Sequence, residues 1–329
     1  MRITRARLID LARQETERRA SADDDILAGY IVGSVAGGEP LLGGVADVDL
    51  VLVHGSNPRV GRELVPLSSD VHLDIAHHPQ SLYAHPPQLR VHPWLGPAIC
   101  EPVLVHDPQH FFERVQAGVR GQFHRPDHVV ARARALLARS HEASASLASA
   151  NPWLQAYATA VLEAANAAAC LAGSPAAGRG LALILEQRAL TLAHPEIHIG
   201  FGLLLGSERV SGLDLTRVLR AWSTAFDAAS RVSSHPQLAA PRRSYYLAAF
   251  QALAEMGKPE AALWPMLTTW DRAIAALDGS ATPAAAEWQQ ILDSLDLASS
   301  ASSRRADELE TYLDHVETIL EEWAERNGA

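Results

Sequence analysis

Residues 31–52, I-V-G-S-V-A-G-G-E-P-L-L-G-G-V-A-D-V-D-L-V-L, decide the expected fold of the N-terminal part of the chain. A Gly-Ser pair follows the apolar run of residues 27–32, and a glycine-rich loop comes next. The apolar, β-branched segment of residues 45–53 then predicts a strand. Because side chains alternate along a strand, Asp47 and Asp49 are expected on the same face. Two such carboxylates repel each other unless a cation lies between them, and Mg2+ prefers oxygen ligands of this kind.

A third acidic residue follows in V-H-L-D-I-A, residues 71–76, which also predicts a strand. If this strand pairs with the first, Asp74 completes a triad of carboxylates that can hold two Mg2+ ions. A D-x-D pair by itself is more often a solvated turn or strand end. The combination with a Gly-Ser pair and a further acid on a neighbouring strand favours a metal site.

This order of features resembles the polymerase-β-like nucleotidyltransferase superfamily. A strand leads to Gly33-Ser34 and a glycine-rich loop, D-x-D lies on a second strand, and a single Asp lies on a third. The resemblance is greatest to the small-molecule branch, which includes the aminoglycoside nucleotidyltransferases. It covers residues 27–108, about a quarter of the chain.

The resemblance implies roles for five residues. Gly33 and Ser34 would hold the β- and γ-phosphates of a nucleoside triphosphate, with ATP as the favoured nucleotide. Asp47 and Asp49 would bind Mg2+, and Asp74 would be the third metal-binding carboxylate. One ion would contact all three acids and the attacking hydroxyl, and a second ion on the D-x-D pair would hold the triphosphate.

Two departures from the family pattern are visible. Residues 35–46 connect the Gly-Ser pair to the first Asp, which is longer than the compact form of the motif. Ala46 stands where a small polar residue often precedes that Asp. Residues 101–107, E-P-V-L-V-H-D, resemble the further strand that follows the third acid in the family.

The composition is that of a globular protein with an acidic balance. Of the 329 residues, 48% are hydrophobic and 20% are charged, and the formal net charge is −10. Lys258 is the only lysine. Without a dense basic stripe a long polyanionic substrate is disfavoured, whereas a small triphosphate needs only a few arginines and the metals. Nucleic acid is therefore not the expected partner.

Cysteine usage and the N-terminus favour a cytoplasmic location. Cys100 and Cys170 are far apart, so they form neither a disulfide framework nor a metal-binding spacing, and both are expected to be buried. The N-terminal segment is too charged for a signal peptide, and no apolar run is long enough to span a bilayer. The sequence gives no indication of the oligomeric state.

The pattern of apolar residues changes character near residue 125 and predicts two domains. Residues 1–125 are expected to form an α/β nucleotidyltransferase domain with a small mixed β-sheet. Residues 126–329 are expected to form an all-α helical bundle. The N-terminal domain is expected to hold helices over 3–19 and 108–119 and strands over 26–32, 45–53, 71–76 and 101–106. The second is expected to hold helices over 127–148, 152–172, 181–193, 213–232, 243–256, 259–277, 283–297 and 304–326, with 194–212 irregular.

Glu163 is a candidate general base. In the helix predicted over residues 152–172, Gln155, Thr159, Glu163 and Asn166 share one face. Glu163 is the only charged residue in a long apolar stretch, so its carboxylate could face a cleft. The alternative, slightly favoured, is a polar stripe that faces solvent on an otherwise buried helix.

Two further sets of residues have both a functional and a structural interpretation. Arg242 and Tyr245 could pair with phosphate and stack on a base. The favoured alternative is a helix start with tyrosines in the core. His72, His77 and His78 invite a zinc hypothesis, but no second pair has convergent spacing, so strand-edge positions are expected instead.

The expected function is Mg2+-dependent transfer of a nucleotide, with AMP favoured, from a triphosphate to a hydroxyl of a small molecule, with release of pyrophosphate. The acceptor class that the resemblance implies is an aminoglycoside-like compound. Two alternatives stay open. One is a nucleotide-binding module of the same fold without transfer activity, and the other is a nucleotidyltransferase that acts on RNA or protein.

Overall fold

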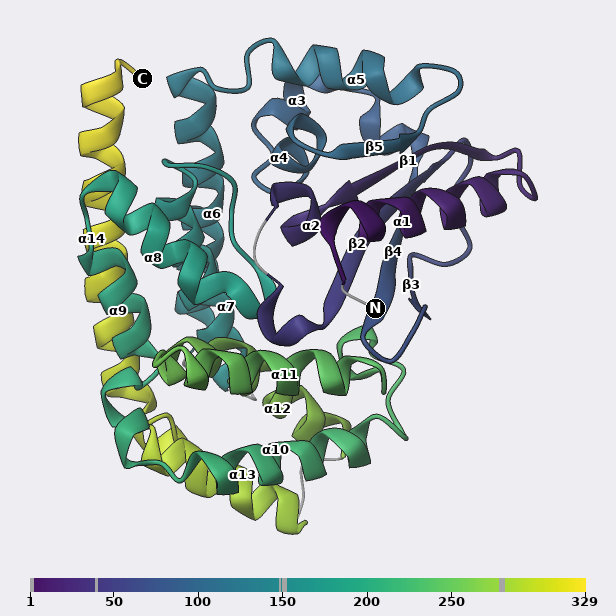
Figure 1. The fold of residues 1–329 in the computed structure, drawn as a ribbon. Coiled ribbons are helices and arrows are strands. Elements are labelled where there is room, and N and C mark those ends of the chain that lie inside the picture. Colours follow the sequence, from purple (N-terminus) through teal and green to yellow (C-terminus); the bar gives the residue numbers. More distant parts are fainter. Residues whose placement is uncertain (1–2, 39–40, 148, 150–152, 278–281) are drawn as a thin grey trace. The chain divides into compact units, whose positions relative to one another are not determined.

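The computed structural model describes residues 3–38, 41–147, 149, 153–277 and 282–329 of the chain. The chain divides into two compact units, residues 1–128 and residues 129–329. A mixed α/β arrangement is confined to the first unit, and the described part of the second unit is mostly helical (Figure 1). The sequence prediction of one sheet-containing part and one helical part is confirmed at this level of detail.

The described residues of the first unit form a five-stranded sheet in the order β3-β4-β2-β1-β5. β2 and β4 run parallel to each other, whereas the β1–β2, β1–β5 and β3–β4 pairs are antiparallel. The sheet is therefore mixed, as predicted. The strands are β1 (Ile26–Val32), β2 (Ala46–His54), β3 (Arg62–Pro66), β4 (Val71–Pro79) and β5 (Val103–His106).

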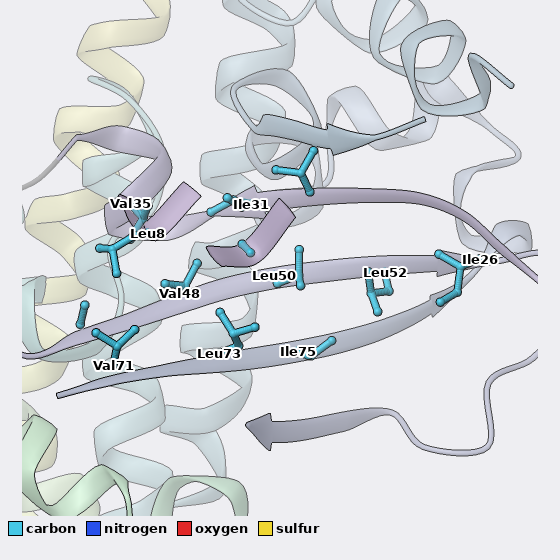
Figure 2. Close-up of a cluster of buried hydrophobic side chains, with 13 residues drawn as sticks. Leu8, Ile26, Ile31, Val35, Val48, Leu50, Leu52, Val71, Leu73 and Ile75 are labelled. Atoms are coloured by element: carbon cyan, nitrogen blue, oxygen red, sulfur yellow. The ribbon is translucent and has the colours of Figure 1, made fainter. Parts of the chain in front are cut away.

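One face of the sheet is covered by helix α1, Arg5–Ala20. Leu8 and Ala12 of this helix join the alternate strand residues Val48, Leu50 and Leu73 in one buried hydrophobic cluster (Figure 2). Thr4 caps the helix by accepting a hydrogen bond from the Arg7 backbone N–H. Side chains alternate along a strand, so the residues of β2 that lie between these buried positions point to the other face of the sheet.

The opposite face carries Val51 and Val53 of β2 in a second buried cluster. Three helices contribute buried residues to this cluster: α3 (Pro86–Arg90), α4 (Leu95–Cys100) and α5 (Phe111–Arg120). By alternation, Asp47 and Asp49 belong to this same face, at the beginning of β2. The two core clusters thus hold the acidic end of β2 in a sheet that is packed on both sides.

The second unit is built from helices that pack both on their neighbours in sequence and on helices farther along the chain. Helix α14 also packs on α7 and α9, and α12 packs on α7, α10 and α13. Helix α6 begins at the end of the first unit and continues into the second. The helices are α6 (Pro126–Ser146), α7 (Trp153–Ala169), α8 (Leu181–Leu192), α9 (Glu196–Leu204), α10 (Leu215–Ala229), α11 (Arg242–Glu255), α12 (Leu263–Ala276), α13 (Pro283–Ser294) and α14 (Ser302–Asn327).

The structure corrects three expectations about local structure. A glycine-rich loop was expected after β1, but Gly33–Gly37 forms one short helix, α2. Strand β3 was not predicted. The segment 194–212 was expected to be irregular, but it contains α9 and a 3-10 helix, Ser207–Gly212. The expected helix start at 151–152 lies outside the described residues.

None of the helices in the described part of the chain has the length and apolar character needed to cross a membrane. Cys100 and Cys170 are both buried and unbonded to each other, as predicted. Burial raises the pKa of the Cys170 thiol to about 12. This thiol therefore stays protonated and acts as a small apolar side chain.

Candidate metal centre

The parallel pairing of β2 with β4 brings the three predicted acids together. In the register of this pair, Asp49 lies opposite Asp74 and Asp47 lies opposite His72. One carboxylate oxygen from each of Asp47, Asp49 and Asp74 lies within 4.8 Å of the others. Asp47 is 5% exposed and Asp74 is 3% exposed, and Asp49 is half-buried. Three carboxylates this close and this buried are stabilised in their charged form by positive charge beside them.

The protein itself supplies part of that charge. Arg62 of β3 donates two hydrogen bonds to Asp74, from Nε to Oδ1 at 2.5 Å and from Nη2 to Oδ2 at 2.6 Å. The Nε2 atom of His72 lies 3.3 Å from Oδ1 of Asp47. The Arg62 side chain is 47% exposed, although the carboxylate it holds is buried. Asp74 is therefore paired with the guanidinium group of Arg62, which lies on the edge strand β3 and has access to solvent.

Gly33 lies directly against the site. It has φ +69°, and a Cβ atom built on it would lie 2.3 Å from Oδ2 of Asp49. A side chain at this position would clash with the carboxylate, and the left-handed backbone favours glycine as well. Ser34 follows in the short helix α2 and is half-buried. The predicted phosphate-binding pair thus adjoins the D-x-D strand, and its role toward phosphate stays a prediction.

The residues present fit a hard divalent cation. All three donors are carboxylate oxygens, which suit Mg2+ or Mn2+ and are less suited to metals that prefer sulfur or imidazole. Among the described residues, no other group of three His, Cys, Asp or Glu side chains has converging ligand atoms. The chemistry of the donor set therefore supports a magnesium-type site.

The histidines of β4 have structural partners. His77 Nδ1 lies 2.9 Å from His54 Nε2, and His77 Nε2 lies 2.8 Å from Oε1 of Glu63. His78 Nδ1 lies 2.7 Å from the hydroxyl of Tyr83. The expectation of strand-edge positions is wrong for His72, which is 2% exposed. It failed because β3 was missed, so that β4 was not recognised as an interior strand.

Glu163 lies in the helical unit and has a partner there. Arg139 Nη2 donates a hydrogen bond to Glu163 Oε2 at 3.0 Å. Burial raises the pKa of this carboxyl group above its ordinary value, and the charge and hydrogen bond of Arg139 offset part of that rise. Of the predicted polar face, Gln155 and Thr159 are exposed, whereas Asn166 is buried and bonded to the Ala176 backbone. The stripe is thus only partly solvent-facing, and the role of Glu163 as a base stays a prediction.

Arg242 and Tyr245 also lie in the helical unit, at the start of α11. Arg242 is 4% exposed, so its guanidinium group is buried. The guanidinium carbon of Arg179 lies 3.7 Å from the centroid of the Tyr245 ring. Arg179 also donates a hydrogen bond to the Tyr245 carbonyl oxygen. These contacts support the structural interpretation of the pair, and a contact with nucleotide stays a prediction.

Two neighbours of the acidic triad were not selected from the sequence. Arg62 belongs to the unpredicted strand β3, and His72 was assigned to a strand edge. The signal in the sequence that could have identified Arg62 is its position as a basic residue in the short segment between the two acid-bearing strands. That segment has the charge and proline typical of edge strands, and these features weaken its strand pattern.

No protein-family model matches the chain, and the comparison with curated proteins finds no match either.

Proposed function

We propose that this protein is a Mg2+-dependent nucleotidyltransferase that transfers a nucleotide, most simply AMP from ATP, to a hydroxyl group of a small molecule. The observation that supports this proposal is the convergence of Asp47, Asp49 and Asp74 from two adjacent parallel strands. The close approach of Asp49 to Gly33 adds support, because it means that the Gly-Ser pair lies beside these acids. An aminoglycoside-like compound is the acceptor class that the sequence resemblance implies.

In the proposed reaction, the acceptor oxygen bonds to the α-phosphorus of the triphosphate, and the bond from that phosphorus to the pyrophosphate oxygen breaks. Mg2+, when bound, would neutralise phosphate charge and make the acceptor hydroxyl more acidic. The three aspartates would hold the ions, and Gly33 and Ser34 would offer hydrogen-bond donors to the terminal phosphates. A general base must accept the proton of the acceptor hydroxyl. Glu163 is the candidate for this role from the sequence analysis.

Charge favours a small acceptor over a nucleic acid. The net charge is −10, and the 28 basic residues form no dense stripe along the sequence that would neutralise a long phosphate backbone. The acids of the site would instead attract an acceptor that carries amines as well as hydroxyls. This argument separates the proposal from the alternative of an enzyme that acts on RNA.

The test combines pyrophosphate release with nucleotide binding. The protein is incubated with each triphosphate and Mg2+ against aminoglycosides, RNA and protein, and pyrophosphate is measured. Asp49→Asn should remove most Mg2+-dependent nucleotide binding. Asp74→Ala should slow single-turnover transfer by at least about a hundredfold, the lower end for loss of a preorganised electrostatic contact. Nucleotide affinity in Asp74→Ala should change far less, since the D-x-D pair would hold the triphosphate-bound ion.

One observation favours a second candidate, a nucleotide-binding module without transfer activity. Both oxygens of Asp74 are already bonded to Arg62. If that pair persisted in the metal-bound protein, the third acid would be unable to contribute to transfer. Mg2+-dependent nucleotide binding without pyrophosphate release for any acceptor class would select this candidate. Mg2+-dependent binding that is unchanged in Asp49→Asn would contradict both.

A further inference from the structure

We propose that the helical unit contains a separate binding pocket for a small apolar amine, with Asp271 as the residue that recognises the ammonium group. The pocket lies between α7 and α12 and has a volume of about 110 Å³. Its lining residues all belong to the second unit. The proposal is therefore independent of the metal centre and of nucleotidyl transfer.

The inner wall of the pocket is apolar and well packed. Leu154 and Tyr157 come from α7, Trp264 and Leu267 come from α12, and each of the four is less than a tenth exposed. The Tyr157 hydroxyl donates a hydrogen bond to the Leu204 carbonyl oxygen, so it is already satisfied. Tyr157 therefore offers this wall no free donor, and the surrounding leucines and Trp264 favour an apolar group.

The acidic residue that lines the pocket is Asp271. It belongs to α12 and is half-buried. Among the described residues its carboxylate makes no hydrogen bond, and the charge that acts on it is that of the adjacent Arg272. Burial raises the pKa of this carboxyl group above its ordinary value, and the charge of Arg272 offsets part of that rise. A carboxylate that is partly desolvated and unbonded gains most from a ligand that brings a positive charge and N–H donors.

The hydroxyl groups of the pocket suit an amine better than an anion. Arg272 also lines the pocket and keeps its positive charge, and its Nη1 donates a hydrogen bond to the side-chain oxygen of Gln237, so the comparison with benzoate below tests its contribution. The hydroxyl groups of Thr159 and Thr268 donate to carbonyl oxygens of their own helices. Their oxygens therefore remain available as acceptors only, which an ammonium group can use and a carboxylate cannot.

The pocket volume sets the size of the ligand. An apolar cavity of about 150 Å³ accepts benzene. The pocket here is smaller but open on one side, so it suits one ring or a branched chain with its polar end at the mouth. A polyhydroxylated sugar would leave hydroxyl groups unpaired against the leucines and Trp264. The inferred ligand is thus a primary amine on a single apolar group.

The experiment uses the full-length protein and benzylamine at neutral pH, with benzyl alcohol and benzoate as neutral and anionic analogues. Calorimetry and ligand-observed NMR should show one saturable site for benzylamine. Benzyl alcohol and benzoate should bind at least about tenfold more weakly, since a hydrogen bond to a charged group contributes at least that factor. The binding site is located by amide protection on α7 and α12.

Three variants assign the contacts. Asp271→Asn should weaken benzylamine binding at least about tenfold. Ala158→Phe, which fills the pocket from α7, should abolish it. Asp293→Asn removes an exposed carboxylate of α13 and should leave binding unchanged. Circular dichroism and the melting temperature verify that each variant is folded.

Several results would overturn the proposal. Equal affinity for benzylamine and benzyl alcohol would show that the pocket recognises only the ring. Tighter binding of benzoate would identify Arg272 as the recognising residue. Benzylamine binding that survives both Asp271→Asn and Ala158→Phe would put the site elsewhere, and no saturable binding at millimolar benzylamine would mean that the pocket takes no such ligand.

Discussion

Arg62 would compete with a metal ion for Asp74. Its guanidinium group takes both oxygens of that carboxylate, so an ion that uses Asp74 must displace it or share one oxygen. Because the Arg62 side chain is 47% exposed, displacement costs less than for a buried pair. The arginine would thus stabilise the metal-free site and lower its affinity for a divalent ion.

Replacing Arg62 by methionine should therefore raise the affinity for Mn2+, used as a paramagnetic substitute for Mg2+. We expect a gain of roughly three- to tenfold, the range for an ion pair with partial access to solvent. Electron paramagnetic resonance of free Mn2+ measures the change. Arg59→Met is the matched control, since Arg59 is an exposed arginine in the segment before the same strand. Unchanged or weaker binding in Arg62→Met alone would contradict the competition.

Gly33 offers a second test at the metal site. Gly33→Ala should cost about 1–2 kcal/mol of folding free energy, because alanine resists a positive φ. It should also lower Mn2+ affinity by at least about tenfold, because the added Cβ displaces the Asp49 carboxylate and removes a charged ligand. Gly38→Ala is the control, since Gly38 has φ +73° but its Cβ would meet only Arg5, at 3.8 Å.

The two effects are separated by measuring urea unfolding and Mn2+ binding on both variants. Gly33→Ala and Gly38→Ala should lose similar stability, whereas only Gly33→Ala should lose metal affinity. If both variants kept wild-type Mn2+ binding, the proximity of Gly33 to Asp49 would have no consequence for the site.

At the level of strands and helices, local patterns predicted the acid-bearing strands but not their environment. Alternation alone placed Asp47 and Asp49 on one face, and β2 and β4 formed as expected. Which residues face those acids depends on strand pairing, and pairing is a long-range property. Strand β3 is short, charged and ends in proline, so its sequence carries little strand signal. Arg62 was missed together with the strand that carries it.

Helix α9 shows how packing can override local propensity. Its sequence contains Gly200 and Gly202, which favour an irregular segment when read alone. In the structure, a Cβ atom on Gly200 would lie 2.7 Å from the Tyr312 ring of α14. The Tyr312 hydroxyl donates a hydrogen bond to the Ile197 carbonyl oxygen. Glycine thus lets two helices approach closely, a reason that only the tertiary structure reveals.

A hydrogen-bonded chain links β1, β4 and the segment after β4, and it predicts a pH dependence. The hydroxyl groups of Tyr30 and Tyr83 lie 2.7 Å apart, and Tyr83 also contacts His78 Nδ1 at 2.7 Å. Burial, followed by the charge of His77, lowers the pKa of His78. In the unfolded chain His78 binds a proton near its ordinary pKa of about 6.5, whereas the folded protein takes it up only at lower pH.

Stability should therefore fall as the pH drops from about 7 through 6.5 toward the lowered pKa of His78. The lowered pKa of His54, caused mainly by burial, acts in the same direction. In His78→Gln the free energy of unfolding should depend less steeply on pH over this range. Urea unfolding at closely spaced pH values measures the slope. A slope equal to that of the wild type would mean that the pKa of His78 is the same in the folded and unfolded protein.

Considered as a whole, the chain contains two separately packed units with different amino-acid patterns. The shift from β-branched runs to alanine-rich helical patterns predicts a boundary near residue 125, because this shift can be read from the sequence pattern alone. The chain divides at 128–129. The family resemblance covers residues 27–108 only. It therefore gives no information on contacts in the second unit, such as those of Glu163 with Arg139 or of Tyr245 with Arg179. Those contacts depend on helix packing, for which the sequence offered only periodicity.

The last prediction concerns the independence of the first unit. Both hydrophobic clusters that cover the sheet draw all their buried residues from positions 8–123. The acids of the metal centre and Arg62 lie within the same span. A fragment of residues 1–125 ends before helix α6 and keeps all these groups, so it should fold cooperatively on its own. It should bind Mn2+ with an affinity within about threefold of the full-length protein, a difference of less than 1 kcal/mol.

Urea unfolding, amide dispersion in NMR spectra and Mn2+ titration test this fragment. The matched control is the same fragment with Asp49→Asn, which should remain folded and lose Mn2+ binding. A folded fragment with much weaker Mn2+ affinity would show that the helical unit contributes to the metal centre. A fragment that fails to fold would show instead that the sheet and its two clusters depend on the helical unit for stability, because burying both faces of the sheet would then not suffice.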